Sequence, residues 1–326
     1  MRDRDAGLPI VGEKQTVENY LTQWLSDIKP TIRPRSWVGH EEAVRLHVLP
    51  TLGRVPLARL SPQQVQALYT AKLAGGLAPG TVARIHAVLS RAFSEAARIG
   101  LVQRNVVALV KPPRPTHQEM QVLTSEQARI LLAAVVDDPL EALYVLALTT
   151  GMRRGELLAL HWADVNLDAG FVQVRFTLQH LAGAQVVYGP PKTARSRRKV
   201  ALSALAIAAL QKHRERQEQQ RVLVGADWVD NDLVFPSGRG GPMEGSYFLR
   251  RKFVPMLKRA GLPEIRFHDL RHTAATLLLL QGIHPKIVSE MLGHSAVSMT
   301  LDTYSHVLPD MQRDATAAFD RLFSPE

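Results

Sequence analysis

Three prolines within four residues, Pro112, Pro113 and Pro115, most constrain how this chain can fold. Proline has no backbone N–H and disfavours the helical conformation of the residue before it, so neither a helix nor a central strand passes through this stretch. Neighbouring prolines give a stiff, extended connector. We therefore expect a first domain at residues 14–110, a linker at residues 111–120 and a second domain at residues 121–326. The short, charged segment at residues 1–13 is expected to be a flexible tail.

The first domain has the start and stop signals of a small helical bundle. Thr16 can cap a helix that runs to Ile28, and Ser61-Pro62 is a strong start signal for another helix. Apolar residues recur at helical spacing in the last helix and predict one buried face. The four predicted helices span residues 16–28, 35–48, 61–73 and 80–99, and the second is expected to be ended by the stretch Leu49-Pro50-Thr51-Leu52-Gly53.

This first domain also holds most of the excess positive charge. The chain has a formal net charge of +10 and an isoelectric point near 10.1, and residues 14–110 contain 12 Lys or Arg against 5 Asp or Glu. Such a surface favours a polyanionic partner, nucleic acid first. Arg84, Arg91 and Arg98 fall seven residues apart and form one helix stripe, which fits either a solvated face or a row of phosphate contacts. The arginines predicted to contact DNA here are Arg33, Arg35, Arg84, Arg91 and Arg98.

Composition excludes several other classes of protein. The chain has no cysteine, which rules out disulfide bonds and thiolate metal sites and allows a reducing compartment. Apolar runs such as residues 130–136 are too short to span a membrane. Residues 1–13 lack the hydrophobic segment of a signal peptide. We therefore expect a cytoplasmic, nucleoid-associated protein with no membrane partner.

The second domain has the pattern of helices around a small antiparallel sheet. Thr124 and Ser203 are helix-capping residues, and residues 171–176 alternate as in a half-buried strand. The predicted helices span residues 124–136, 140–150, 203–222 and 246–260. The predicted strands span residues 162–165, 171–176, 186–192, 197–202 and 233–235, with 186–192 paired to 197–202. The whole chain is thus expected to be mainly α, a helical bundle followed by an α+β domain.

The stretch from Phe267 to Tyr304 predicts three short helices joined by tight turns. Gly282 ends the first helix, and Pro285 starts the second. Gly293 ends the second, and Ser295 can cap a third helix. Hairpinned in this way, the helices would bring two histidines, an arginine and a phenol towards one point, a set that suits chemistry on an anion. These residues are His268, Arg271, His294 and Tyr304.

Each of these motifs alone is common, but five of them occur in one order along the chain. The first is Thr150-Gly151-x-Arg153-x-x-Glu156-Leu157, and the second is Lys192 followed by Ser196, Arg198 and Val200. The others are His268-x-x-Arg271-His272, Leu292-Gly293-His294-Ser295 and Tyr304. In this order and spacing the motifs resemble those of the tyrosine recombinase, or phage integrase, family across residues 14–323.

The resemblance implies a nucleophile and a phosphate-binding pair. Tyr304 would attack DNA and form a 3′-phosphotyrosine. Arg153 and Arg271 would hold the scissile phosphate, because planar guanidiniums suit its oxygens better than lysines do. The arginines supply the charge that a metal would, so the resemblance implies no metal and no cofactor.

The resemblance also implies which residues transfer protons, and two arginines near Lys192 are predicted to contact DNA. Lys192 would protonate the departing 5′ oxygen, and His294 would hydrogen-bond the phosphate. His268 would accept the phenol proton, directly or by orienting a neighbour, and Glu156 would orient Arg153 or His268. Five of the eight residues from Lys192 to Lys199 are basic, and Arg195 and Arg197 are predicted to contact DNA.

The expected function is site-specific recombination of double-stranded DNA, integrating or excising a mobile element. The family implies four protomers on two sites, and an accessory directionality factor is a further expected partner. A final helix, capped by Asp310 and ending near Phe323, would dock on its own domain or on a neighbouring protomer. Only thirteen residues precede the first predicted domain, so the arm-binding domain of many such integrases is expected to be either absent or upstream of this sequence.

Three other functions use some of the same residues. A DNA-binding regulator on a catalytically dead scaffold would lack at least one motif residue, and none is lacking. A type IB-like DNA-relaxing enzyme would share the chemistry but would not join two duplexes. A metal-dependent nuclease would need carboxylates beside histidines such as His268, His272 and His284, and no carboxylate cluster accompanies them.

Overall fold

A computed structural model of the chain describes residues 15–115, 120–180, 186–189, 197–294 and 296–304, together with Thr316, Asp320 and Phe323. The chain divides into two compact units, residues 1–119 and 120–326, and each has its own hydrophobic core. The predicted fold class is confirmed, because helices predominate and both small sheets are antiparallel. The predicted tail at residues 1–13 and the predicted cap at Asp310 lie outside the described residues.

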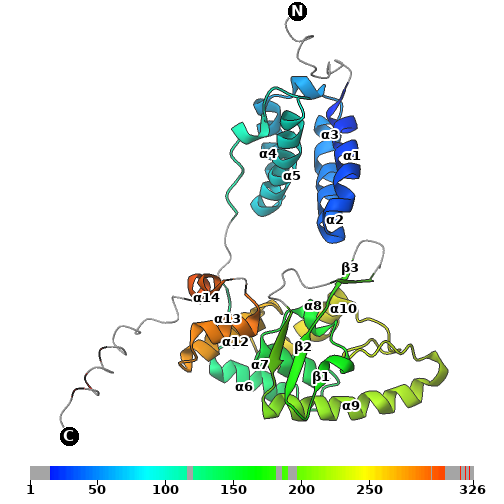
Figure 1. Cartoon of the computed structure of the whole chain (residues 1–326), viewed down its shortest axis with the longest axis vertical. Helices are drawn as coiled ribbons and strands as arrows, with labels where there is room; N and C mark the ends of the chain where they lie inside the picture. Colours follow the sequence, from blue (N-terminus) through cyan, green and yellow to red (C-terminus); the bar gives the residue numbers. More distant parts are fainter. Residues whose placement is uncertain are drawn as a thin grey trace, which may run out of the picture. The chain divides into compact units, whose positions relative to one another are not determined.

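The first unit is a bundle of helices (Figure 1). They are α1 (Val17–Ile28), α2 (Pro34–Ala43), α3 (Leu49–Leu52), α4 (Pro62–Ala74) and α5 (Pro79–Arg98), with 3-10 turns at Lys29–Thr31, Leu57–Arg59 and Val107–Leu109. The predicted caps are confirmed: Thr16 Oγ1 accepts a hydrogen bond from the Asn19 N–H at 3.2 Å, and Ser61 forms a reciprocal capping box with Gln64. Buried side chains such as Leu21 from α1 and Leu89 from α5 form the core.

The second predicted helix does not end at Leu49. A wider π-helical turn, Val44–Val48, joins α2 to α3, and the Leu49 N–H bonds to the Val44 carbonyl. Because α3 begins at Leu49, Pro50 falls in its first turn, where the missing N–H has no helical partner to lose. The helix therefore runs past the predicted bound at Val48, and it ends at Leu52, within the stretch Leu49–Gly53 that was predicted to end it.

The second unit packs helices around two small sheets (Figure 1). Before the strands come α6 (Ser125–Ala134), α7 (Glu141–Thr150) and α8 (Arg154–Leu157). After them come α9 (Ala204–Val224), α10 (Gly245–Phe248), a π-helical turn at Leu249–Phe253, α11 (Val254–Arg259), α12 (Asp269–Leu280), α13 (Pro285–Leu292) and α14 (Val297–Tyr304). None of the helices described is long and apolar enough to cross a membrane.

The strand pairing differs from the prediction. One sheet has the order β1 (Val165–Asn166), β2 (Phe171–Val174), β5 (Arg198–Ala201), and a second sheet pairs β3 (Thr177–His180) with β4 (Val186–Gly189). The predicted pairing of residues 186–192 with 197–202 is wrong, because Val172 and Val200 are buried opposite each other and hold β5 against β2.

Two further predicted strands are absent from the described residues. The segment at residues 162–165 is a 3-10 turn, Trp162–Asp164, that leads into β1. The segment at residues 233–235 makes an isolated bridge, between Leu233 and His161. The segment at residues 233–235 is nevertheless held in the core, because the Val234 N–H bonds to the Leu160 carbonyl at 2.8 Å and the Val234 side chain is buried.

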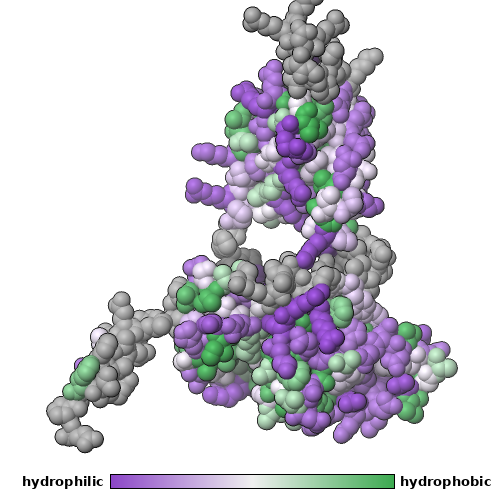
Figure 2. Space-filling view, in the orientation of Figure 1, coloured by the Kyte–Doolittle hydropathy of each residue, from purple (hydrophilic) through white to green (hydrophobic). Residues whose placement is uncertain are grey.

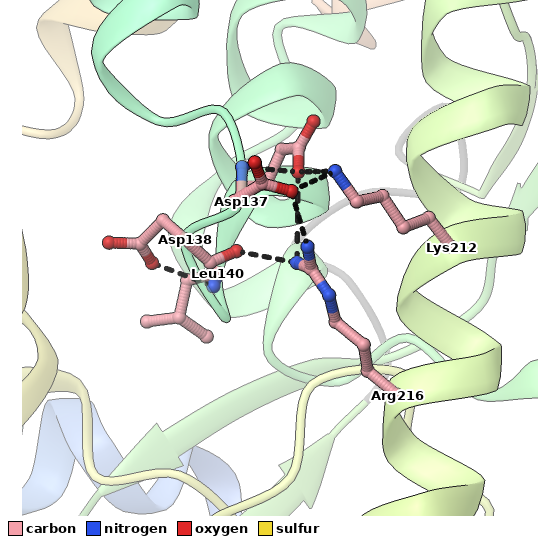
Figure 3. A network of polar contacts seen from close by, with 6 residues as sticks. Asp137, Asp138, Leu140, Lys212 and Arg216 are labelled. Carbon is pink, nitrogen blue, oxygen red and sulfur yellow. Dashed lines mark hydrogen bonds and ion pairs between the residues drawn. The ribbon is translucent and has the colours of Figure 1, made fainter.

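Ion pairs hold α9 against the turn between α6 and α7 (Figure 3). Lys212 Nζ lies 2.6 Å from Asp137 Oδ1 and 3.1 Å from Glu141 Oε2, and Arg216 donates to Asp137 Oδ1 at 3.1 Å and to the Asp138 carbonyl at 3.0 Å. Most of these side chains are partly exposed, so the network fixes geometry more than it adds stability. It anchors the beginning of α7, whose other end carries the first motif.

Candidate active site

The turn between α7 and α8 brings the first motif against the last helices. Gly151 ends α7 with a φ of +62°, in the left-handed region that favours glycine. A Cβ atom at this position would lie 2.4 Å from Leu292 Cδ2, so a side chain here would collide with α13. Arg153 follows as the N-cap residue of α8. It lies close enough to Arg271 for its charge to lower the pKa of Arg271.

The buried carboxylate of Glu156 holds Arg153 in place. It accepts hydrogen bonds from the Arg153 backbone N–H at 3.0 Å, from Arg153 Nη1 at 2.8 Å and from Arg198 Nη2 at 3.0 Å. Burial alone would raise the pKa of Glu156, but Arg198 and then Arg153 hold this pKa below its ordinary value. Glu156 is therefore ionised, and of its two predicted partners it orients Arg153.

Arg271 is a buried cation that is only partly satisfied. It lies on α12 with 3% of its surface exposed, and its Nη1 donates to the Gly151 carbonyl at 2.8 Å. Its Nη2 is buried and has no hydrogen-bond partner among the residues that the structure describes. Burial, and after it the nearby Arg153, lower the pKa of Arg271 to about 9. The free end of this guanidinium is suited to an anionic oxygen.

His268 and His294 are uncharged members of the site. Burial lowers the pKa of each ring to about 4, and the charges of Arg271 and Arg153 act in the same direction. His294 Nδ1 lies 2.8 Å from Thr300 Oγ1, which ties the turn after α13 to α14. At neutral pH each imidazole therefore offers one N–H donor and one nitrogen acceptor.

Tyr304 is buried at the end of α14. It faces His272, a motif residue for which the sequence predicted no catalytic role. Its hydroxyl lies 2.7 Å from His272 Nδ1, and the residue is 1% exposed. Burial raises the pKa of Tyr304 to about 12, against the opposing effect of Arg271. Burial also lowers the pKa of His272, which favours a neutral ring that can accept the phenol proton.

His268, the predicted proton acceptor, lies beside His272. The two ring centroids are 5.1 Å apart and the rings meet edge to face. Residues four apart on a helix share a face, so the spacing in His268-x-x-Arg271-His272 is the signal that could have identified His272. The structure brings His268, Arg271, His294 and Tyr304 into one site with Arg153 and Glu156, whereas Lys192, Arg195 and Ser295 lie outside the described residues.

The arginines predicted to contact DNA are all exposed where the structure describes them, but they differ in their ion pairs. Arg84 and Arg91 are exposed and make no ion pair with any described residue, whereas Arg98 pairs with Glu95. Arg84 and Arg91 lie near His40 of α2, where, after burial, their charges lower its pKa. The lowered pKa favours the neutral form of His40, so the positive charge of this surface comes from the arginines of α5. Arg33, Arg35 and Arg197 are also exposed.

No group of three histidine, aspartate or glutamate side chains within the described ranges is placed to hold a metal ion. The cations of the site come instead from Arg153, Arg198 and Arg271, two of which are bound by the single carboxylate of Glu156. The excess of guanidinium over carboxylate makes this site a receptor for an anion.

Family models match both units of the chain. A model described as the phage integrase family matches residues 121–311, and one described as phage integrase, N-terminal SAM-like domain, matches residues 16–73. The first match alone covers more than half of the 326 residues. The chain therefore belongs to the phage integrase family, and its function is that of a tyrosine-type site-specific DNA recombinase.

Curated relatives align with nearly the whole chain. An integrase of Streptomyces ambofaciens is 31% identical, covering 99% of this chain and 84% of the relative. An integrase of Saccharopolyspora erythraea is 29% identical over 99% of this chain and 86% of its own. A protein of Caldanaerobacter subterraneus subsp. tengcongensis described as tyrosine recombinase XerC-like is 27% identical over 97% and 86%.

Solved structures share the fold at lower identity. The integrase of the Tn1549 transposon, solved with a circular intermediate DNA, has a TM-score of 0.77 at 21% identity and covers 94% of this chain and 99% of its own. A lambda integrase tetramer bound to a Holliday junction has a TM-score of 0.64 at 20% identity, covering 89% and 77%. At 20% to 21% identity, these two solved structures support the fold of the chain and nothing further.

Proposed function

We propose that this recombinase breaks and rejoins DNA through Tyr304, with Arg153 and Arg271 holding the scissile phosphate. The observation that carries the proposal is the buried guanidinium of Arg271, whose Nη1 is engaged by the Gly151 carbonyl and whose Nη2 has no described partner. A buried donor without an acceptor is costly, and more so when it is charged. A phosphate oxygen supplies both the acceptor and the opposite charge.

The charges of the site suit a phosphoryl transfer. When an oxygen attacks a phosphodiester, negative charge grows on the equatorial oxygens of the pentacoordinate state. Arg271 and Arg153, the latter held by Glu156, are fixed before the reaction begins, so little reorganisation is needed as this charge develops. The neutral rings of His268 and His294 add hydrogen bonds without adding charge.

Two proton transfers accompany the exchange. The Tyr304 hydroxyl loses its proton to His272 Nδ1, 2.7 Å away, as its oxygen bonds to phosphorus. The bond from phosphorus to the 5′ oxygen breaks, and Lys192 protonates that oxygen. A 5′ hydroxyl from another strand then attacks the 3′-phosphotyrosine and gives its proton to the now neutral Lys192. The bond from phosphorus to Tyr304 breaks, and the phenolate takes back its proton from His272, so the phosphodiester is restored without ATP.

Four protomers exchange the strands of two DNA sites in pairs through a four-way junction. The lambda integrase tetramer on a Holliday junction, similar in fold to this chain, supports this assembly. Figure 2 shows some apolar (green) surface where Figure 1 draws α13 and α14. Four apolar side chains on these two helices are exposed and suit a helix passed from a neighbouring protomer: Ile287, Val297, Met299 and Leu301. The reaction integrates or excises a mobile element at the nucleoid, and an accessory factor sets its direction.

The test is covalent capture on DNA. The Tyr304→Phe variant would first select its binding sequence from fragmented source DNA, since it should bind without cutting. That sequence would then be built into a nicked duplex, whose short 5′ strand diffuses away after cleavage and leaves the protein attached. The parent should accumulate an adduct on the 3′ end, and Tyr304→Phe should form none. An adduct of equal yield in Tyr304→Phe would refute the role of Tyr304.

A further inference from the structure

A buried arginine outside the assigned catalytic set joins separate parts of the site. Arg198 begins β5, and 6% of its side chain is exposed. Its Nη2 donates to Glu156 Oε2 at 3.0 Å, and its Nε donates to the Met291 carbonyl at 2.6 Å. One guanidinium therefore connects the carboxylate that holds Arg153 with the last turn of α13.

The turn after α13 is packed around the same side chain. Gly293 has a φ of +71°, and a Cβ atom there would lie 3.0 Å from both Cδ and Nη1 of Arg198. The N–H groups of Gly293 and His294 bond to the Glu290 and Ser289 carbonyls at 3.0 Å, which closes the helix just before the site. The position of His294 therefore depends on a turn that is built against Arg198.

We propose that Arg198 is a positioning residue for DNA cleavage. It fixes Arg153 through the carboxylate of Glu156, and it fixes the turn that carries His294 through the carbonyl of Met291. A guanidinium can donate in two directions at once, whereas a lysine ammonium at the same place reaches only one of these acceptors. The inference rests on the proposed function, because it assigns Arg198 to the site of Tyr304.

The experiment compares two arginines that each bind a buried carboxylate. Arg198→Met removes the link to Glu156, and the control, Arg175→Met, removes the pair between Arg175 Nε and Asp164 Oδ1, which are 2.8 Å apart and belong to none of the five motifs. Asp164 and Glu156 have side-chain exposures of 6% and 2%, so each variant takes one arginine from a buried carboxylate. Arg175 is itself 60% exposed and Arg198 6%, so a melting curve of each variant checks that it folds. Adduct formation is measured in single turnovers on the nicked duplex at saturating protein, and affinity is measured on the intact duplex.

Arg198→Met should form the adduct about 100-fold more slowly than the parent, the scale of loss expected when a catalytic group is slightly misplaced. Its affinity for the intact duplex should stay within about threefold, because the phosphate contacts of the surface are untouched. Arg175→Met should match the parent in both measurements. A cleavage rate of Arg198→Met close to the parental rate, or a loss of affinity as large as the loss of rate, would overturn the proposal.

A double variant tests whether Arg198 acts through Glu156. If the two side chains work as one unit, Glu156→Gln combined with Arg198→Met should be little slower than the slower single variant. Losses that multiply would overturn the proposal. If Arg198→Met does not fold, Arg198→Lys replaces it, with an expected loss of about tenfold in rate and unchanged affinity. Parental cleavage by Arg198→Lys would then be the contrary result.

Adduct formation by the parent protein distinguishes a failure of the proposed function from a failure of the positioning role of Arg198. If the parent forms no Tyr304 adduct, the proposed function fails. If the parent forms the adduct and both Arg198 variants form it equally fast, only the positioning role of Arg198 fails.

Discussion

The hydroxyl of Tyr304 lies 2.7 Å from Nδ1 of His272, on the helix that also carries Arg271. Burial raises the pKa of the phenol to about 12, so the hydroxyl keeps its proton at neutral pH. In the proposed reaction the hydroxyl loses this proton during the attack, and His272 Nδ1 is the described atom in contact with it. The packing of α14 against α12 thus sets both the place of the proposed nucleophile and the base beside it.

His272→Phe should slow adduct formation by about 100-fold or more, because it keeps the ring packing but removes the acceptor. DNA affinity should not change. A duplex with a sulfur in place of the 5′ bridging oxygen sharpens the test, because a thiolate leaves without needing a proton. This duplex should restore cleavage by Lys192→Ala but not by His272→Phe. Equal rescue of both variants would remove His272 from the role of base.

Arg271→Lys should lose about 100-fold or more in cleavage rate, although it keeps the positive charge. A single ammonium cannot bond to the Gly151 carbonyl and also present a forked donor to the phosphate. Because guanidiniums are proposed to balance the phosphate charge, adduct formation by the parent should persist in excess EDTA. A loss with chelator that magnesium restores would point to a metal-dependent nuclease instead.

Arg84→Gln combined with Arg91→Gln should weaken DNA binding across all sequences, since both side chains are exposed and without an ion-pair partner in the described residues. Removing two phosphate contacts should make the slope of log affinity against log salt shallower by about two. Arg98→Gln is the matched control on the same stripe, and its effect should be smaller because Arg98 is paired with Glu95. Equal salt slopes for the double variant and the parent would mean that the stripe is only solvated.

Acid should weaken the folded state through His294. Its folded pKa of about 4 lies below the ordinary 6.5, owing first to burial and then to Arg271 and Arg153. The unfolded chain therefore takes up this proton first, so the stability tied to His294 is present above pH 6.5 and is lost as pH falls towards 4. Between about pH 7 and about pH 4.5, the melting temperature of His294→Gln should fall less than that of the parent. Parallel curves would contradict this assignment.

Local signals in the sequence were enough to predict most helices and their ends. Thr16, Ser61 and Ser203 cap helices as expected, because a cap is a bond between residues three apart in the chain. Gly151 and Gly293 end helices in the left-handed conformation for an equally local reason. The ordered motifs also placed His268, Arg271, His294 and Tyr304 in one site.

Features that depend on distant partners could not be predicted in this way. The pairing of β5 with β2 is decided by which valines meet in the core, and residues 186–192 alternate well enough to fit another register. The roles of His272 and Arg198 depend on contacts with Tyr304 and Met291, which are far along the chain. Spacing places a side chain on a face, but only tertiary packing decides what that face meets.

The burial of Tyr304 also bears on the safety of carrying such an enzyme in a cell. Burial raises the pKa of the phenol to about 12, which keeps it protonated at neutral pH, and the ring is 1% exposed to solvent. A chromosome contains very many chemically identical phosphodiesters, and an exposed, permanently ionised tyrosine could attack many of them. The oxygen proposed as the nucleophile is sheltered and protonated in this chain, which would limit damage to the host genome by chemistry as well as by sequence recognition.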